Sequence, residues 1–141
     1  MPLPEHLLML EVLSQRMESG LGLSADQLHR TFSSVESGNI KLLESTTEIG
    51  RYIGYIAYGY FDAPTLRLLS RTGQLPKNRH EWNEGRIMFV HDVVIQARWR
   101  DEGIRQLRHF VSDTRALAHK RRSTLMLYSC GRRKRAHHLR A

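Results

Sequence analysis

Residues 86–95, which read RIMFVHDVVI, decide the fold. The run is apolar on both faces and rich in β-branched residues, which is typical of a strand in the middle of a sheet. Apolar residues at helical spacing follow from 101 to about 119, and residues 124–128, TLMLY, form another β-type run. A strand, a helix and a strand in this order predict a right-handed crossover with two parallel strands. We therefore expect an α/β fold with a mixed sheet and a C-terminal βαβ crossover.

Two helices are expected before this unit. The first, over 5–20, has apolar residues on two sides, which predicts that it is well buried. The second begins at Ser24, a favourable N-cap, and Gln27 could complete a capping box. The apolar sides of the first helix are formed by Leu7, Leu10, Leu13 and Met17 and by Leu8 and Val12, and the stripe of the second by Leu28, Phe32 and Val35.

The segment between these helices and the central strand is expected to be mostly β. Residues 40–43 and 52–60 are rich in aliphatic and aromatic side chains and flank a polar turn, so they predict an antiparallel hairpin. A short helix capped by Asp62 should then run to Gly73. The polar stretch 73–85 is long for a connection without structure of its own, and such loops are often functional.

Length and composition restrict the class of protein. A chain of 141 residues has the size of one domain, and we expect a single domain over 1–131 followed by a basic tail over 132–141. Its one cysteine excludes an intrachain disulfide and Cys-rich zinc sites, and we expect no metal. No apolar run reaches the ~20 residues of a membrane span, and no signal peptide is apparent. These features predict a cytoplasmic protein without a membrane span.

The positive charge is concentrated in the last third of the chain. Residues 1–94 hold 9 basic and 11 acidic side chains, whereas residues 95–141 hold 13 basic and 3 acidic ones, a net charge of +10. Such a density indicates a polyanionic partner, which could be nucleic acid, an acidic protein, an anionic membrane surface or a phosphate-bearing cofactor.

The start of the crossover helix carries a local motif. Arg100, Gly103 and Ile104 follow the central strand in an Arg-x-x-Gly-x arrangement, which resembles motif A of the GNAT acyltransferases. Arg105 stands where that family has Gly or Ala. In such a turn, backbone N–H groups and the positive helix terminus bind pyrophosphate. The resemblance implies that Arg100, Gly103, Ile104 and Arg105 bind the phosphates of the acyl donor, coenzyme A or the phosphopantetheine of acyl carrier protein.

A second resemblance covers roughly residues 28–103. The strand GYIAYG at 54–59 and the run WNEGRIMFVHD at 82–92 are similar to the toxin-activating lysine acyltransferases of RTX haemolysin systems, which have a divergent GNAT fold. That family transfers a fatty acyl group from acyl carrier protein to protein lysines, using a histidine and an aspartate. The aspartate corresponds to Asp92, and a Leu-His-Arg-x-aromatic match at 28–32 places the histidine at His29.

The two candidate catalytic residues suit this chemistry. Transfer to an amine needs a base that takes the ammonium proton, and a neutral imidazole such as that of His29 is such a base near pH 7. Asp92 lies among valines, where a carboxylate needs a partner. In the reaction it could orient or polarise the reacting groups. Its neighbour His91 should point to the opposite face of the sheet, because adjacent strand residues alternate.

The sequence leaves two classes of function open. One is an acyltransferase whose basic segment docks an acidic acyl carrier protein or a protein substrate. The other is a catalytically inactive module whose basic C-terminal part engages nucleic acid or an acidic protein. The chain ends earlier than a typical GNAT domain, so a second copy could complete the fold in a homodimer.

Overall fold

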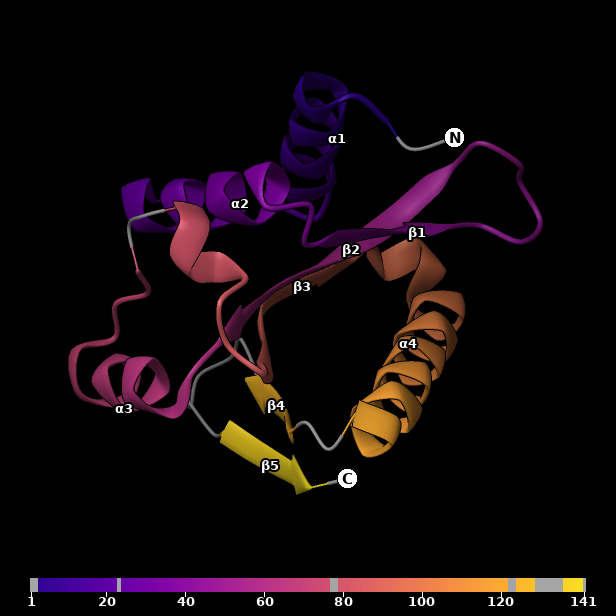
Figure 1. Cartoon of the computed structure of the whole chain (residues 1–141). Helices are drawn as coiled ribbons and strands as arrows, with labels where there is room; N and C mark the ends of the chain where they lie inside the picture. Colours follow the sequence, from indigo (N-terminus) through magenta and orange to yellow (C-terminus); the bar gives the residue numbers. More distant parts are fainter. Residues whose placement is uncertain (1–2, 23, 77–78, 122–123, 129–135, 141) are drawn as a thin grey trace.

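The computed structural model describes residues 3–22, 24–76, 79–121, 124–128 and 136–140, and it describes side chains as far as Thr114, except those of residues 79 and 80. The chain folds as a mixed α/β structure (Figure 1). The described strands form one sheet in the order β1-β2-β3-β4-β5. They are β1 (Ile40–Glu44), β2 (Tyr52–Phe61), β3 (Ile87–Ile95), β4 (Thr124–Tyr128) and β5 (Ala136–Arg140).

The helices surround this sheet. The α-helices are α1 (Glu5–Glu18), α2 (Ala25–Glu36), α3 (Ala63–Thr72) and α4 (Arg100–Arg121), and the short 3₁₀ turns are η1 (Arg79–Trp82) and η2 (Ala97–Trp99). Within the described part of the chain, none of these helices is both long and apolar enough to cross a membrane.

The local signals in the sequence act as predicted. The Ser24 side chain accepts from the Gln27 N–H while the Gln27 side chain accepts from the Ser24 N–H, which is the capping box. Asp62 caps α3, which ends at Gly73 in a left-handed conformation that glycine adopts without strain. β1 and β2 form the expected antiparallel hairpin, and β3 and β4 are parallel with α4 between them.

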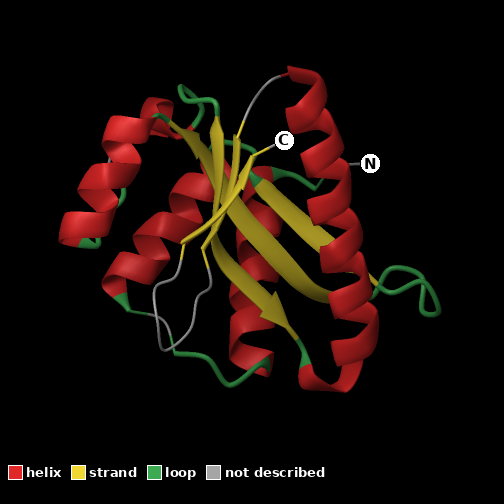
Figure 2. Cartoon of the chain, turned by 90° about the horizontal axis from the view of Figure 1, so that it is seen from below, coloured by secondary structure: helices red, strands yellow, loops and turns green. Residues whose placement is uncertain are grey.

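The two faces of the sheet have different covers. α1 and α2 lie over one face and α4 lies over the other (Figures 1 and 2). The core beneath α1 and α2 contains Val12, Val35, Tyr55, Ala57 and Val94. The core beneath α4 is built from Leu43, Ile53, Ile56 and Val90, with Leu107 and Phe110 of α4 packed against it.

The sequence predicts the buried faces of the first two helices only in part. Val12 of α1 and Val35 of α2 are buried and Leu8 packs against them, as expected. In contrast, Leu10 and Met17 of α1 are 61% and 78% exposed, and Leu28 and Phe32 of α2 are also exposed. The reason is that each helix turns polar side chains toward polar partners on the sheet. The inward face of α1 carries Val12, Gln15 and Arg16, and that of α2 carries Thr31, Ser34 and Val35.

Two further expectations are corrected. The stretch 73–85 is not a loop throughout, because it contains η1 and ends with a bridge between Asn83 and Tyr60. The stretch 132–141 is not simply a tail, because its described part, Ala136–Arg140, is strand β5, antiparallel to β4. Residues 132–135 and 141 lie outside the described residues.

Candidate functional site

β3 contains a β-bulge in the middle of the sheet. Ala57 of β2 is in register with Asp92, and the next residue, Tyr58, is in register with Val90. His91 is therefore an extra residue on β3 with no opposite residue on β2. An extra residue of this kind interrupts the alternation of side chains between the two faces of a strand.

The bulge brings His91 and Asp92 to the same face of the sheet. The His91 ring contacts Ser34 of α2, and the Asp92 carboxylate contacts Arg16 of α1. Both helices lie over one face, so the prediction that His91 and Asp92 point to opposite faces is wrong. On either side of the bulge the strand is regular, since Val90 and Val93 both point toward α4.

Asp92 is held in a buried cluster with two partners. Its Oδ2 atom lies 2.7 Å from Nη1 of Arg16 and 2.6 Å from the Tyr55 hydroxyl, which donates to it. Nη1 of Arg16 also lies 3.3 Å from the Tyr55 hydroxyl, and Nη2 donates to the Gly22 carbonyl. The side chains of Arg16 and Asp92 are 5% and 13% exposed. The carboxylate is thus an anchor that joins α1 to the central strands.

The charges in this cluster stabilise one another. Burial works against the charge on Arg16, but Tyr55 and Asp92 outweigh it, so the pKa of Arg16 is raised. Burial and the adjacent Asp92 carboxylate raise the pKa of the Tyr55 phenol, which stays protonated. Nε of Arg16 is buried and has no hydrogen-bond partner among the described residues.

A second polar contact lies beside it, around His91. Its Nε2 is 2.6 Å from the Ser34 hydroxyl, which lies 3.0 Å from the Tyr58 carbonyl, and its ring packs edge-on against Trp82. Burial, together with the charges of Arg30 and Arg16, lowers the pKa of His91 to about 3. His91 is therefore neutral at physiological pH. Ser34 is fully buried, so this serine–histidine contact does not present a nucleophile to solvent.

β3 and β4 run parallel at the start of β3. The pairing joins residues 87–90 of β3 to residues 124–127 of β4. Residues 92–95 of β3 pair with β2, and the chain then passes through η2 into α4.

The four residues expected to bind phosphate lie in the first two turns of α4. Arg100 and Arg105 are exposed, Ile104 is partly buried, and Gly103 is buried. A Cβ atom on Gly103 would lie 2.3 Å from Cγ2 of Ile95, so glycine is required here for the close packing of α4 on β3. Asp92 faces α1 and α2, and these four residues therefore do not join it in one cluster.

The amino end of α4 is fixed to the β1–β2 turn through Glu102. This carboxylate accepts hydrogen bonds from the Thr46 N–H and hydroxyl, the latter at 2.9 Å, and from the Ser45 hydroxyl. The Thr46 N–H contributes most to lowering the pKa of Glu102. Near this helix start, four exposed arginines make no ion pair with the described carboxylates: Arg98, Arg100, Arg105 and Arg108.

His29 lies on the exposed side of α2. No hydrogen bond or ion pair joins it to Asp92 or to any other described residue. The sequence did not predict the two residues that contact Asp92, which are Arg16 and Tyr55. A signal was present, because Arg16 lies four residues after Val12 on one side of α1, and a cation at that position needs a buried anion.

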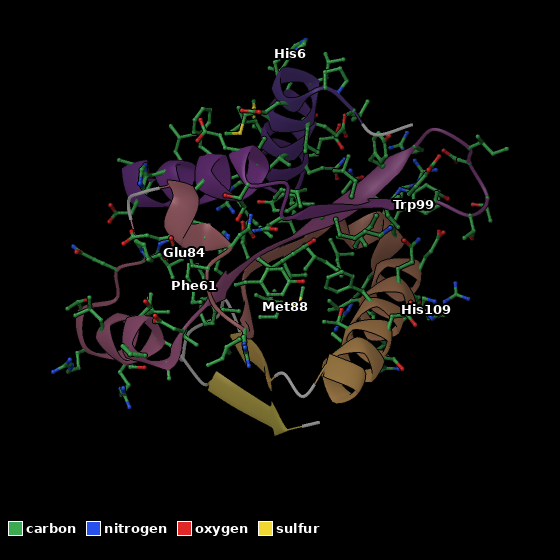
Figure 3. The ribbon with its side chains drawn as sticks, in the orientation of Figure 1. His6, Phe61, Glu84, Met88, Trp99 and His109 are labelled. Atoms are coloured by element: carbon green, nitrogen blue, oxygen red, sulfur yellow. The ribbon has the colours of Figure 1, made fainter. Side chains whose placement is uncertain are left out.

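The described residues contain no group of three or more histidine, cysteine, aspartate or glutamate side chains placed to hold a metal ion. Figure 3 shows two of the labelled side chains near α4, with His109 on the outer side of the helix and Trp99 at its amino end.

Comparison with known proteins finds no matching family model and no matching curated protein.

Proposed function

We propose that the protein is a GNAT-like N-acyltransferase that moves a fatty acyl group from acyl carrier protein or coenzyme A to an amine, a protein lysine. The observation that carries the proposal is the crossover from β3 through η2 into α4, beside the parallel pair β3–β4, with exposed arginines at the start of the helix.

The exposed arginines support an anionic donor. Arg98, Arg100, Arg105 and Arg108 occupy η2 and the first three turns of α4, which follow β3 directly. Phosphate oxygens are favourable partners for arginine and for a helix N-terminus. An acidic carrier protein would approach the same cations.

In the proposed reaction, His29 takes a proton from the acceptor ammonium group. The amine nitrogen then attacks the thioester carbonyl, a C–N bond forms and the C–S bond breaks. The attacking nitrogen gives up its second proton and the released thiolate takes up one proton, which yields the amide and the free thiol. Asp92 acts as a positioning residue, since its carboxylate is engaged by Arg16 and Tyr55. Neutral His91 lies at the bulge of β3, next to Asp92.

The first test measures thermal stabilisation by three probes: an acyl carrier protein thioester, a coenzyme A thioester and duplex DNA. A ligand that binds the folded state raises the melting temperature. Stabilisation by a thioester but not by DNA supports the proposal and opposes the nucleic-acid module. Stabilisation by DNA alone contradicts it.

The second test addresses the base. His29→Ala should abolish acyl transfer, whereas His6→Ala, which changes another exposed histidine on the neighbouring helix α1, should leave transfer unchanged. Full activity in His29→Ala would remove His29 from the mechanism. Both variants change exposed side chains, so their melting temperatures should match that of the unmodified protein.

A further inference from the structure

β1 is an edge strand with an open outer side. It pairs with β2 on one side and has no described strand on the other. The ladder fixes which of its residues face outward: Tyr58 N–H donates to Asn39 and Ser45 N–H donates to Arg51, so the odd-numbered residues point their backbone groups toward β2. Ile40, Leu42 and Glu44 therefore point theirs away from the sheet.

The open side is closed at one end only. The Glu44 carbonyl accepts a hydrogen bond from Nε2 of Gln106, at 2.7 Å, which caps the edge with a side chain of α4. The N–H and C=O groups of Ile40 and Leu42 have no such cover among the described residues. An unpaired edge of this kind is a template for another strand.

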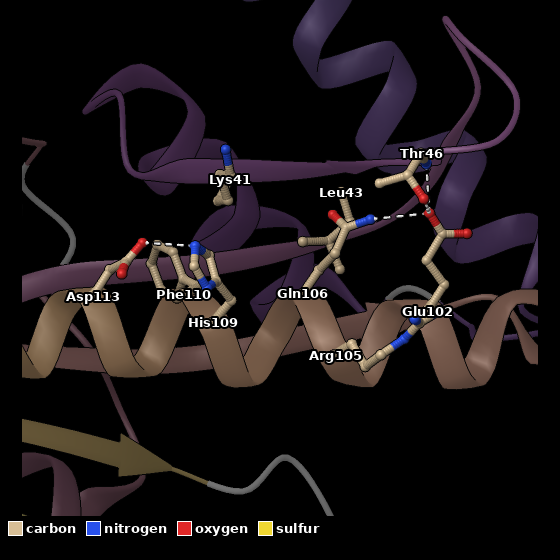
Figure 4. A pocket seen from close by; sticks show the side chains of 9 residues that line it. All are labelled: Lys41, Leu43, Thr46, Glu102, Arg105, Gln106, His109, Phe110 and Asp113. Atoms are coloured by element: carbon tan, nitrogen blue, oxygen red, sulfur yellow. Dashed lines mark hydrogen bonds and ion pairs between the residues drawn. The ribbon is translucent and has the colours of Figure 1, made fainter.

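A groove accompanies this edge on each face of the sheet. The first, the β1/α4 groove, has a volume of about 600 Å³ and lies between β1, the turn after it and α4 (Figure 4). Leu43 and Phe110 supply its apolar surface. The second, the β1/α1 groove, has a volume of about 530 Å³ and is lined by the start of α1, the end of α2, β1 and Tyr52. An added strand would send alternate side chains into the two grooves.

The charges of the two grooves differ. In the β1/α4 groove, Glu102 is occupied by Thr46 and Asp113 pairs with His109, so Lys41 and Arg105 are left as cations without an ion pair. The β1/α1 groove, which Lys41 also lines, carries two carboxylates, Glu5 and Glu36, beside apolar residues that include Leu8 and Leu42. A ligand strand that fits both has acidic side chains on its α4 side and apolar side chains on the other.

We propose that β1 binds an extended peptide of a partner protein, which adds to the sheet as an antiparallel strand with alternating acidic and apolar residues. A second copy of the chain is the alternative occupant, and the sedimentation experiment below distinguishes it from a peptide. This proposal does not depend on acyl transfer.

The register predicts the hydrogen bonds of the peptide. In an antiparallel pair, opposite residues share a face and their backbone groups point toward each other together. The peptide residues opposite Ile40 and Leu42 therefore donate to β1 and place their side chains in the β1/α1 groove. Those opposite Lys41 and Leu43 place theirs in the β1/α4 groove and point their N–H groups to solvent.

The test uses a fluorescein-labelled nonapeptide in which valine and glutamate alternate, and reads binding by fluorescence polarisation. N-methylation of the valines should weaken binding about tenfold or more, because each removed donor faces β1. N-methylation of the glutamates should leave binding unchanged. No binding by any of the peptides, or equal loss from both N-methylated forms, overturns the proposal.

Variants of the protein give a second measurement. Lys41→Glu should weaken peptide binding about tenfold, whereas Arg108→Glu, the same charge change on the outside of α4, should not. Leu42→Pro removes only an outward donor, so the ladder to β2 is kept, and it should also weaken binding. A dimer in sedimentation velocity that Leu42→Pro dissociates would show that β1 pairs with a second copy and would overturn the peptide proposal.

Discussion

The two faces of the sheet are stabilised differently. Beneath α1 and α2, a buried ion pair and a neutral histidine lie among apolar residues, with Arg16, Asp92 and His91 each engaged by a partner. Beneath α4 the core is made of aliphatic and aromatic side chains, and the polar contacts of Glu102 lie at its margin. The stability of the polar face therefore depends on each buried charged or polar group having its partner, and on pH. The stability of the apolar face depends on how closely its side chains pack. Each of the following predictions tests one side of that contrast.

Removal of Asp92 should have the largest effect. Asp92→Ala leaves the guanidinium of Arg16 buried without its anion, and breaking a buried ion pair costs about 3–5 kcal/mol of the free energy of unfolding. Urea unfolding would measure the loss. Asp113→Ala is the matched control, because Asp113 pairs with His109 at the surface, where such pairs contribute about 0–1 kcal/mol.

A double variant sharpens this result. Arg16→Met combined with Asp92→Leu removes both charges and should recover most of the lost free energy of unfolding, because apolar replacements of a buried pair are often neutral. Similar small losses in Asp92→Ala and Asp113→Ala would contradict the assignment of a buried, partnered cluster to the polar face.

Acid should weaken the polar face through His91. The pKa of His91 is about 3 in the folded protein and about 6.5 in an unfolded chain, so between these values the unfolded state binds one more proton. The contribution of neutral His91 is fully present above pH 6.5 and is lost as the pH falls toward 3, by up to about 1.4 kcal/mol per pH unit.

Urea unfolding at pH 6.5, 5.5 and 4.5 would measure this slope. His91→Gln should flatten it, because glutamine does not titrate, and His109→Gln, a change at an exposed histidine, should retain it. An unchanged slope in His91→Gln would show that other groups carry the acid sensitivity.

The apolar face should respond to volume. Gly103→Ala places a methyl group 2.3 Å from Cγ2 of Ile95 and should cost about 1–3 kcal/mol, as overpacking does. Ile95→Ala in the same chain should relieve the contact. Gly22→Ala is the control, since nothing lies within 4 Å of the added atom. Thermal unfolding of these three variants would measure the effect, and no loss in Gly103→Ala would argue against the close packing of α4 on β3.

Much of the fold follows from local signals in the sequence. The capping box at Ser24, the cap at Asp62, the β1–β2 hairpin and the β3–β4 parallel pair all follow from short patterns whose physical cause is local. The buried faces of α1 and α2 follow only in part, because which side a helix buries is decided by partners far along the chain. Arg16 and Asp92 are 76 residues apart.

The candidate site is predictable only in part. The sequence indicates that Asp92 needs a partner but does not identify Arg16 and Tyr55. It singles out Gly103 for phosphate binding, whereas the structure shows that Gly103 packs closely against Ile95. The bulge is hard to predict from the sequence, because it requires only one extra residue and no glycine. The roles of His29 and Asp92 in acyl transfer stay predictions.

The bulge divides β3 into two segments, and within each segment side chains alternate regularly between the two faces of the sheet. If His91 is omitted, Phe89, Val90, Asp92, Val93, Val94 and Ile95 alternate between the faces without interruption, since all keep the sides they occupy in the structure. The histidine is therefore an extra residue in the ladder that leaves the alternation of the rest of the strand in place. It gives this face of the sheet a buried titratable group without displacing any neighbouring core position from its face.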